Sequence, residues 1–413
     1  MENYLKEKFT YWGIGSIALG IFVSVSVPSL FHIFVLIPAL IVCAESFKMG
    51  ELKLPKSSYF LIALVLWGYI ANIYNFDLLD NPVRSFGKLK YFIYAVICIP
   101  LFQRAFKVYI NPVRAKRLLN ILLFTIICAA GYGLIKYYPK RISGFTNTMR
   151  YGYGTSMVLS ILLGILLHKK NLKPILNKKF FYFAVLMGFL GLFGTKTRGA
   201  LLGLTCSIPF IVYFYNKSWG KRVFVITFGV ILLVAANIIF FGGSTKFRLL
   251  DKLGSDSNLK RYSQFESSFR TTLNNPIFGV GVNNFSSLCP QIKNDLDIFW
   301  PKYCKEHEFL NCKFHETVTK QYCSHSHNIF LETSVNMGFV GGVLLLMWFL
   351  LWGWELFKMK NLLAILIIPF WVNMAVAGQF ENIFDANNSF LIFFLYPLSF
   401  VDIPEYLKVN RNS

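Results

Sequence analysis

Two histidines in the segment Cys323-Ser-His-Ser-His-Asn-Ile-Phe-Leu-Glu332 are the residues best suited to chemistry. The segment lies where a long polar stretch meets an apolar run. An imidazole titrates near neutral pH, so it can take a proton from a hydroxyl as a general base. We predict His327 as the catalytic base and His325 and Asn328 as substrate-binding neighbours. Asn328 has a second interpretation, as the cap of the helix that follows.

Basic residues between apolar runs form the second set of candidates. Lys196-Thr-Arg198-Gly199 separates two apolar runs with almost no loop between them. Arg141 and Arg150 flank another short connection. A planar guanidinium donates two parallel hydrogen bonds and so suits a diphosphate. We predict Arg198 as catalytic and the other three as diphosphate or glycan ligands, against the alternative that they reach toward lipid headgroups or are ordinary loop cations.

A further candidate lies in the polar stretch, where Arg261, Phe265, Phe269 and Leu273 follow an i, i+4 spacing. This spacing predicts a short amphipathic helix, which Asn275-Pro276 should end. We predict Arg261 as a catalytic ligand of the substrate, with Arg270 as a nearby binding candidate. The alternative is a helix that only rests on the membrane surface.

The elements that position these residues must be membrane helices. The chain has 413 residues, of which 55% are hydrophobic and 15% charged, and this indicates an all-α integral membrane protein. Its net charge of +22 does not indicate a nucleic-acid binder, because the basic residues lie between apolar runs. We count about twelve runs long enough to span a bilayer. They are residues 11–27, 30–44, 58–73, 90–103, 118–138, 151–168, 180–195, 199–215, 222–241, 328–357, 361–378 and 388–403.

Basic clusters set the expected orientation. Arg104–Arg117, Lys169–Lys179 and Lys217–Arg222 fall on one side of the predicted spans, which the positive-inside rule assigns to the cytoplasm. Both termini should then be cytoplasmic, and no cleaved signal peptide is expected. The predicted divisions are residues 1–241 with spans one to nine, a long periplasmic loop over 242–326 with short amphipathic helices, and residues 327–413 with spans ten to twelve and a cytoplasmic tail.

The eight cysteines divide between spans and loop. Cys43, Cys98, Cys128 and Cys206 lie in predicted spans and are interpreted as small apolar residues. The four in the loop are Cys289, Cys304, Cys312 and Cys323. They are consistent with two disulfides, with a zinc site that uses the Cys304-x-x-His307 and Cys312-x-x-His315 spacings, or with free thiols. Because no acidic cluster has ligand spacing, we predict chemistry without a divalent metal.

Four strings together resemble the O-antigen ligase family of lipopolysaccharide biosynthesis, which is related to the O-antigen polymerases. They are Arg141-Ile-Ser-Gly144; Thr195-Lys-Thr-Arg198-Gly-Ala-Leu-Leu; Arg261 with Pro276, Gly279-Val-Gly281 and Phe285; and His325-Ser-His327-Asn328 with Gly338. The resemblance covers roughly residues 140 to 380, and it is carried by the order and spacing of the strings.

The resemblance implies a glycosyltransferase-C-like fold and an active site on the periplasmic side of a Gram-negative inner membrane. It implies transfer of a glycan from undecaprenyl diphosphate to lipid A core, with no cofactor. The family's essential residues fall on Arg198, Arg261 and His327. One departure is Asn336, where many relatives carry a glutamate, so a carboxylate role at that position is in doubt.

Three other functions stay open at this point. An O-antigen polymerase would use the same donor to extend another lipid-linked glycan. A transporter of the lipid-linked sugar is a second alternative, although polar or broken helices near the midplane, typical of transporters, are not evident. A sugar-binding membrane scaffold is the third.

Overall fold

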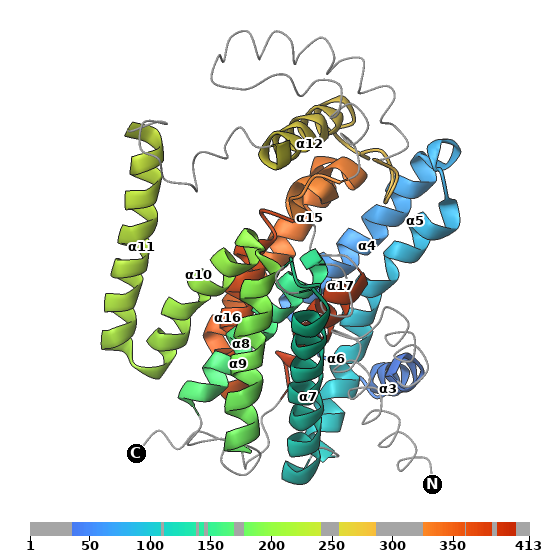
Figure 1. Cartoon of the computed structure of the whole chain (residues 1–413). Coiled ribbons are helices and arrows are strands. Elements are labelled where there is room, and N and C mark those ends of the chain that lie inside the picture. Colours follow the sequence, from blue (N-terminus) through green and yellow to red (C-terminus); the bar gives the residue numbers. More distant parts are fainter. Residues whose placement is uncertain are drawn as a thin grey trace.

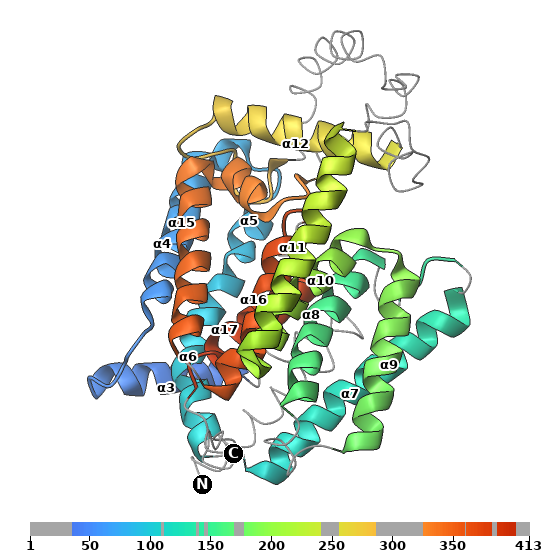
Figure 2. The same ribbon diagram turned by 90° about the vertical axis from the view of Figure 1, so that its left-hand side faces the viewer.

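In the computed structural model the chain is a bundle of helices with α12 lying across one end (Figures 1 and 2). The structure describes residues 35–108, 111–137, 140–143, 148–168, 177–240, 256–285, 325–359, 361–381 and 386–401. These residues form helices and turns and contain no strand, in agreement with the predicted all-α class.

The helices are as follows in chain order: α3 (Ile37–Lys48), α4 (Lys56–Tyr74), the 3-10 turn η2 (Phe76–Leu78), α5 (Pro82–Lys88), α6 (Lys90–Val108), α7 (Pro112–Tyr137), α8 (Thr148–Leu167), α9 (Lys178–Thr195), α10 (Arg198–Tyr215), α11 (Lys217–Phe240), α12 (Asp256–Asn274), α15 (Ile329–Met359), α16 (Leu362–Ala377) and α17 (Ala386–Leu398).

Within the described ranges, 7 helical stretches are long and apolar enough to cross a membrane, and Leu362–Ala377 is a shorter apolar helix. Each predicted span from 58–73 onward coincides with a helix, but α17 has only 13 residues. Residues 11–27 and the first residues of the predicted span 30–44 lie outside the description. The count of twelve spans and the periplasmic placement of residues 242–326 therefore remain predictions.

The sequence pattern indicates no broken helix, and this expectation is wrong at one point: α15, which covers the predicted span 328–357, is broken at Gly338. This residue has φ 70° and ψ −178°, which is outside the helical region. Only glycine adopts such a backbone conformation readily. The break leaves backbone groups on both sides of Gly338 without their helical partners, and such groups are costly at membrane depth.

Residues 276–281 satisfy those groups. The backbone N–H groups of Val280 and Gly281 donate to the carbonyls of Val335 and Asn336 at 2.9 and 3.0 Å. In return, the N–H of Phe339 donates to the carbonyl of Pro276 at 2.8 Å. The turn after α12 is thus bonded directly into the gap in α15.

Helix α4 and the turn η2 that follows it supply further partners. Trp67 donates its indole N–H to the carbonyl of Met337 at 2.8 Å, and its ring stacks on Phe278 with centroids 5.2 Å apart. Asn72 accepts the backbone N–H of Val282 at 2.7 Å. The buried Asn284 donates to the carbonyl of Leu78 at 3.0 Å. Residues 276–285 are therefore held between α4 and α15.

A buried amide ties three other helices together. Asn373 of α16 donates to the carbonyl of Ser156 in α8 at 3.0 Å, and the Ser156 hydroxyl lies 3.3 Å from the Asn373 amide oxygen. On α10, a Cβ added at Gly203 would meet that oxygen at 2.6 Å. Since α8 begins near Arg150 and α10 begins at Arg198, this contact fixes two helices that carry predicted site residues.

Helix α12 is amphipathic as predicted, but it buries its polar face. Its buried residues are Gln264, Ser267, Ser268, Thr271 and Thr272. Their hydroxyls donate back to carbonyls within the helix, so this face packs without unsatisfied hydroxyl donors. Phe265, Phe269 and Leu273 form the predicted apolar stripe and are exposed at 46%, 43% and 52%.

We expect Gly338→Ala to destabilise the protein by more than about 1 kcal/mol, since the new Cβ would collide with the carbonyl of Ile277 at a positive φ. Gly87→Ala in α5 is the matched control, because no atom lies within 4 Å of its added carbon. Gly50→Ala isolates the backbone cost, since Gly50 has φ +69° and open surroundings. Thermal unfolding of the three variants in detergent makes the comparison. Equal losses in Gly338→Ala and Gly50→Ala would show that docking of residues 276–281 contributes nothing.

Candidate active site

The histidine loop, residues 325–328, is joined to residues 378–381 at the end of α16. The backbone N–H of Ile329, the first residue of α15, donates to the carbonyl of Gly378 at 2.9 Å. The side-chain amide of Asn328 donates to Gln379 Oε1 at 2.8 Å. Two segments that are about fifty residues apart in sequence therefore meet at the start of α15.

Local hydrogen bonds fix the shape of the histidine loop. Asn328 Oδ1 accepts the backbone N–H groups of Phe330 and Leu331 at 3.0 Å each, so the predicted helix cap is confirmed. Glu332 accepts the N–H of Ser326 at 2.7 Å and lies 3.0 Å from its hydroxyl. Ser326 is buried, and the rings of its neighbours His325 and His327 lie side by side with centroids 4.1 Å apart.

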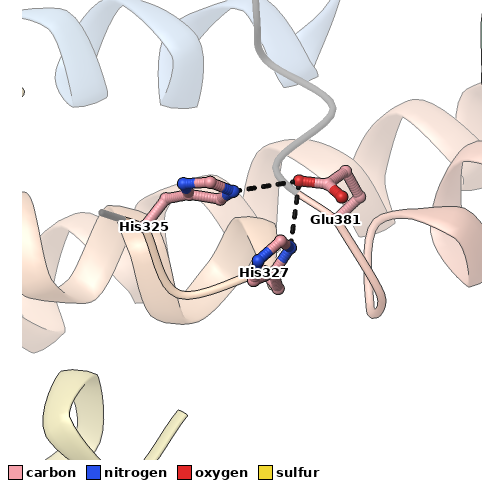
Figure 3. Close-up of side chains that lie close together, drawn as sticks. All are labelled: His325, His327 and Glu381. Atoms are coloured by element: carbon pink, nitrogen blue, oxygen red, sulfur yellow. Dashed lines mark ion pairs between the residues drawn. The ribbon is translucent and has the colours of Figure 1, made fainter. Parts of the chain in front are cut away.

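Glu381 lies against both histidines (Figure 3). Its Oε1 is 3.1 Å from His327 Nδ1 and 3.3 Å from His325 Nε2, and the imidazole centroids are 4.1 Å apart. The side chain of Glu381 is 12% exposed, that of His327 18% and that of His325 36%. His327 also has φ 53°, a left-handed conformation that is rare for a residue with a side chain. Backbone strain of this kind is concentrated at functional sites.

The contacts determine the charge state of the carboxyl group. Burial alone would raise the pKa of Glu381, but its contacts with His325 and His327 outweigh burial and lower the pKa from 4.5 to about 2. Glu381 is therefore ionised at neutral pH. An ionised carboxylate stabilises a neighbouring imidazolium and orients the imidazole ring.

The predicted arginine turn, residues 195–198, packs against the same segment. Helix α9 ends at Thr195 and α10 begins at Arg198, so the expected absence of a loop is confirmed. A Cβ added at Gly199 would lie 3.0 Å from Phe380 Cβ and would also contact the Tyr153 hydroxyl. Phe380 precedes Glu381 in the chain. The start of α10 therefore packs against Phe380, and the two histidines contact the next residue, Glu381.

The other predicted cations are placed as follows. Arg141 donates its Nε–H to the carbonyl of Thr195 at 2.9 Å, which brings its guanidinium to the arginine turn. Lys196 and Arg198 are exposed, and Lys196 has a left-handed φ of 55°. Arg150 is half-buried in the first turn of α8. Thus Arg141, Lys196 and Arg198 gather at one end of the bundle.

The structure describes only some of the candidates predicted in the polar loop. Arg270 forms an ion pair with Glu266 one turn away at 2.8 Å, and both side chains are partly buried. Arg261 belongs to α12, but its side chain lies outside the described residues. The four loop cysteines, His307 and His315 also lie outside the description. Among the described cysteines, Cys43, Cys98, Cys128 and Cys206 are free.

Glu381 is the residue that sequence reasoning missed. It follows the predicted span 361–378, and its one signal is an acidic group directly after an apolar run. His325, His327 and Glu381 offer three ligand-type atoms within 4.8 Å of one another. Two imidazoles and a carboxylate suit several divalent metals, and spacing along the chain gave no indication of this group. The prediction of metal-independent chemistry has not been tested and remains a prediction.

We next compared the sequence with models of known protein families. Residues 182–346 match the family model described as O-antigen ligase. Over this segment the chain is similar to the O-antigen ligase family. The matched segment contains the arginine turn, α12 and the histidine loop, so the resemblance drawn from these three strings is confirmed. The string that begins at Arg141 lies before the matched residues. The matched segment ends before Glu381. A search of curated proteins found no match to the chain.

The lowered pKa of Glu381 predicts a specific loss of stability in acid. Since the folded value is about 2 and the ordinary value 4.5, the ionised carboxylate contributes its full stabilisation above pH 4.5 and loses it as the pH falls toward 2. The melting temperature of the wild type should exceed that of Glu381→Gln at pH 6. This difference should shrink between pH 4.5 and pH 3. A difference that is unchanged over this range would contradict the proposed charge state.

Proposed function

We propose that this chain is an O-antigen ligase of a bacterial inner membrane. It takes a glycan from undecaprenyl diphosphate and joins it to a sugar hydroxyl of lipid A core on the periplasmic side. The family match supports a function of the O-antigen ligase or polymerase type. The finer assignment rests on the chemistry of the residues that meet at the start of α10 and α15.

The donor needs cations that hold a diphosphate. In this proposal Arg198 and Arg261 bind it, and Arg141 assists from its place beside Thr195. Guanidinium groups stabilise the negative charge that grows on the diphosphate as its bond to the sugar breaks. Lys196, Arg150 and Arg270 are auxiliary ligands of the diphosphate or glycan. Because the lipid diphosphate is itself an activated leaving group, no nucleotide cofactor or divalent metal is required.

The acceptor needs a base. His327 takes the proton from the acceptor hydroxyl as its oxygen attacks the anomeric carbon, and the carbon–oxygen bond to the diphosphate breaks. The undecaprenyl diphosphate leaves with the bonding electrons. Attack from the face opposite the leaving group inverts the anomeric centre. His325 and Asn328 line the approach to His327, and Asn328 also caps α15.

The observation that carries the proposal is the contact of His327 Nδ1 with an ionised, buried Glu381, one residue from Phe380, which packs on the helix of Arg198. A base and a cationic turn are thereby joined through one short segment. A transporter requires no such base, and a sugar-binding scaffold requires neither a base nor a strained histidine. An O-antigen polymerase would use the same site, so the acceptor must be tested directly.

The test is transfer by purified protein from a polyprenyl-diphosphate-linked glycan, with EDTA present and two acceptors offered together. One acceptor is lipid A core and the other is a second glycan-lipid. We expect glycan on lipid A core, and we expect His327→Ala to lower the rate at least about 10²-fold, the usual contribution of general-base catalysis. His168→Ala is the matched control, since His168 follows the last residue of α8, at the other end of that helix from Arg150, and meets the Tyr215 ring edge-on.

Other results of the transfer assay would point to a different function or mechanism. A ladder of lengthened glycan-lipid with no lipid A product would identify a polymerase. Full activity in His327→Ala would remove the base from the proposal. A folded wild type that makes no product on either acceptor, both in EDTA and after Zn²⁺ or Mn²⁺ is added, would favour transport or binding of the lipid-linked glycan.

A further inference from the structure

Glu381 lies outside the family segment, 54 positions after His327, yet its carboxylate contacts that histidine's ring. The contact uses Nδ1, at 3.1 Å. Because an imidazole carries its two nitrogens on different sides of the ring, Nε2 is directed elsewhere. A neutral imidazole that donates through one nitrogen bears its lone pair on the other.

We propose that Glu381 is the positioning residue of the base. Its Oε1, 3.1 Å from His327 Nδ1, favours the tautomer that carries the proton on Nδ1, so that Nε2 is the nitrogen that accepts the proton of the sugar hydroxyl. The carboxylate then stabilises the imidazolium that forms, without taking the proton itself. This inference rests on the proposed function, because it assumes that His327 is the base.

His325 contacts the same oxygen and has a supporting role. Its Nε2 is 3.3 Å from Glu381 Oε1, and its side chain is twice as exposed as that of His327. A carboxylate paired with two imidazoles has less rotational freedom than one paired with a single imidazole. His325 therefore fixes the carboxylate that in turn fixes His327.

The backbone explains why this carboxylate can serve as a fixed partner. The carbonyl of Gly378 accepts from Ile329, and Gln379 accepts from Asn328 at 2.8 Å. A Cβ added at Gly378 would meet Ile329 Cδ1 at 2.8 Å, so the two segments are in close contact. These bonds hold the residues immediately before Glu381 against the histidine loop.

The test measures kcat and KM for both substrates in Glu381→Gln, an isosteric change that removes the charge. We expect kcat to fall about 10²-fold while the KM values change little, since the carboxylate acts on the base rather than on the substrates. Glu381→Asp restores the charge on a shorter side chain and should recover part of kcat. Glu355→Gln is the matched control: Glu355 accepts from Ser57 in another part of the fold, and kcat should be unchanged.

A double variant tests the role of His325. We expect His325→Ala to lower kcat about 10-fold on its own. If His325 acts only through Glu381, adding His325→Ala to Glu381→Gln should cause no further loss. Full multiplication of the two effects would contradict the shared-carboxylate arrangement.

The outcomes separate this inference from the proposed function. Wild-type kcat in Glu381→Gln, with His327→Ala inactive, would overturn the role of Glu381 and leave the base in place. An active His327→Ala would instead remove the proposed function. Loss of activity in EDTA with recovery on adding Zn²⁺ or Mn²⁺ would show that the three side chains hold a metal, which would also overturn the inference. If Glu381→Gln does not fold, Glu381→Asp decides: a folded Glu381→Asp with undiminished kcat contradicts the need for this placement.

Discussion

The fold depends on satisfying the backbone groups exposed where α15 breaks at Gly338. Unpaired backbone donors and acceptors are costly inside a membrane, so a broken helix persists only where other groups replace its bonds. Here Val280 and Gly281 supply the missing donors and Pro276 the missing acceptor. That exchange joins the turn after α12 to the first third of α15. It also explains why glycines recur in this part of the chain, since any Cβ at Gly338 or Gly279 would enter a neighbouring backbone.

The starts of α10 and α15 present a set of cations and a base backed by a carboxylate. The start of α10 offers exposed cations suited to a diphosphate, while the start of α15 offers an imidazole backed by a carboxylate. Phe380 contacts the first and adjoins the second. In the proposed reaction, this separation keeps the cations on the leaving group and the base on the attacking hydroxyl. The buried Asn373 contacts both α8 and α10 from its position in α16, so it holds these three helices together.

Much of this could be predicted from the sequence, because the relevant signals are local. Apolar runs gave the positions of α4 and of α6 to α11, the tight turn at Lys196 followed from two adjoining runs, and the capping role of Asn328 followed from its place before an apolar helix. Three features could not be predicted. The break at Gly338 and the contact of Glu381 with His327 depend on segments far apart in sequence. The buried polar face of α12 depends on its neighbour, since the i, i+4 pattern identifies a stripe but not the surface that covers it.

The central claim is direct attack by a hydroxyl whose proton passes to His327. The anomeric configuration of the product tests it most directly, because a single displacement must invert the donor sugar and a double displacement through a glycosyl-enzyme must retain it. The measurement is NMR of the new glycosidic linkage, compared with the linkage of the same sugar to the diphosphate in the donor. Our account predicts inversion. Retention would contradict it, since a covalent intermediate would then require a nucleophile where we place only a base.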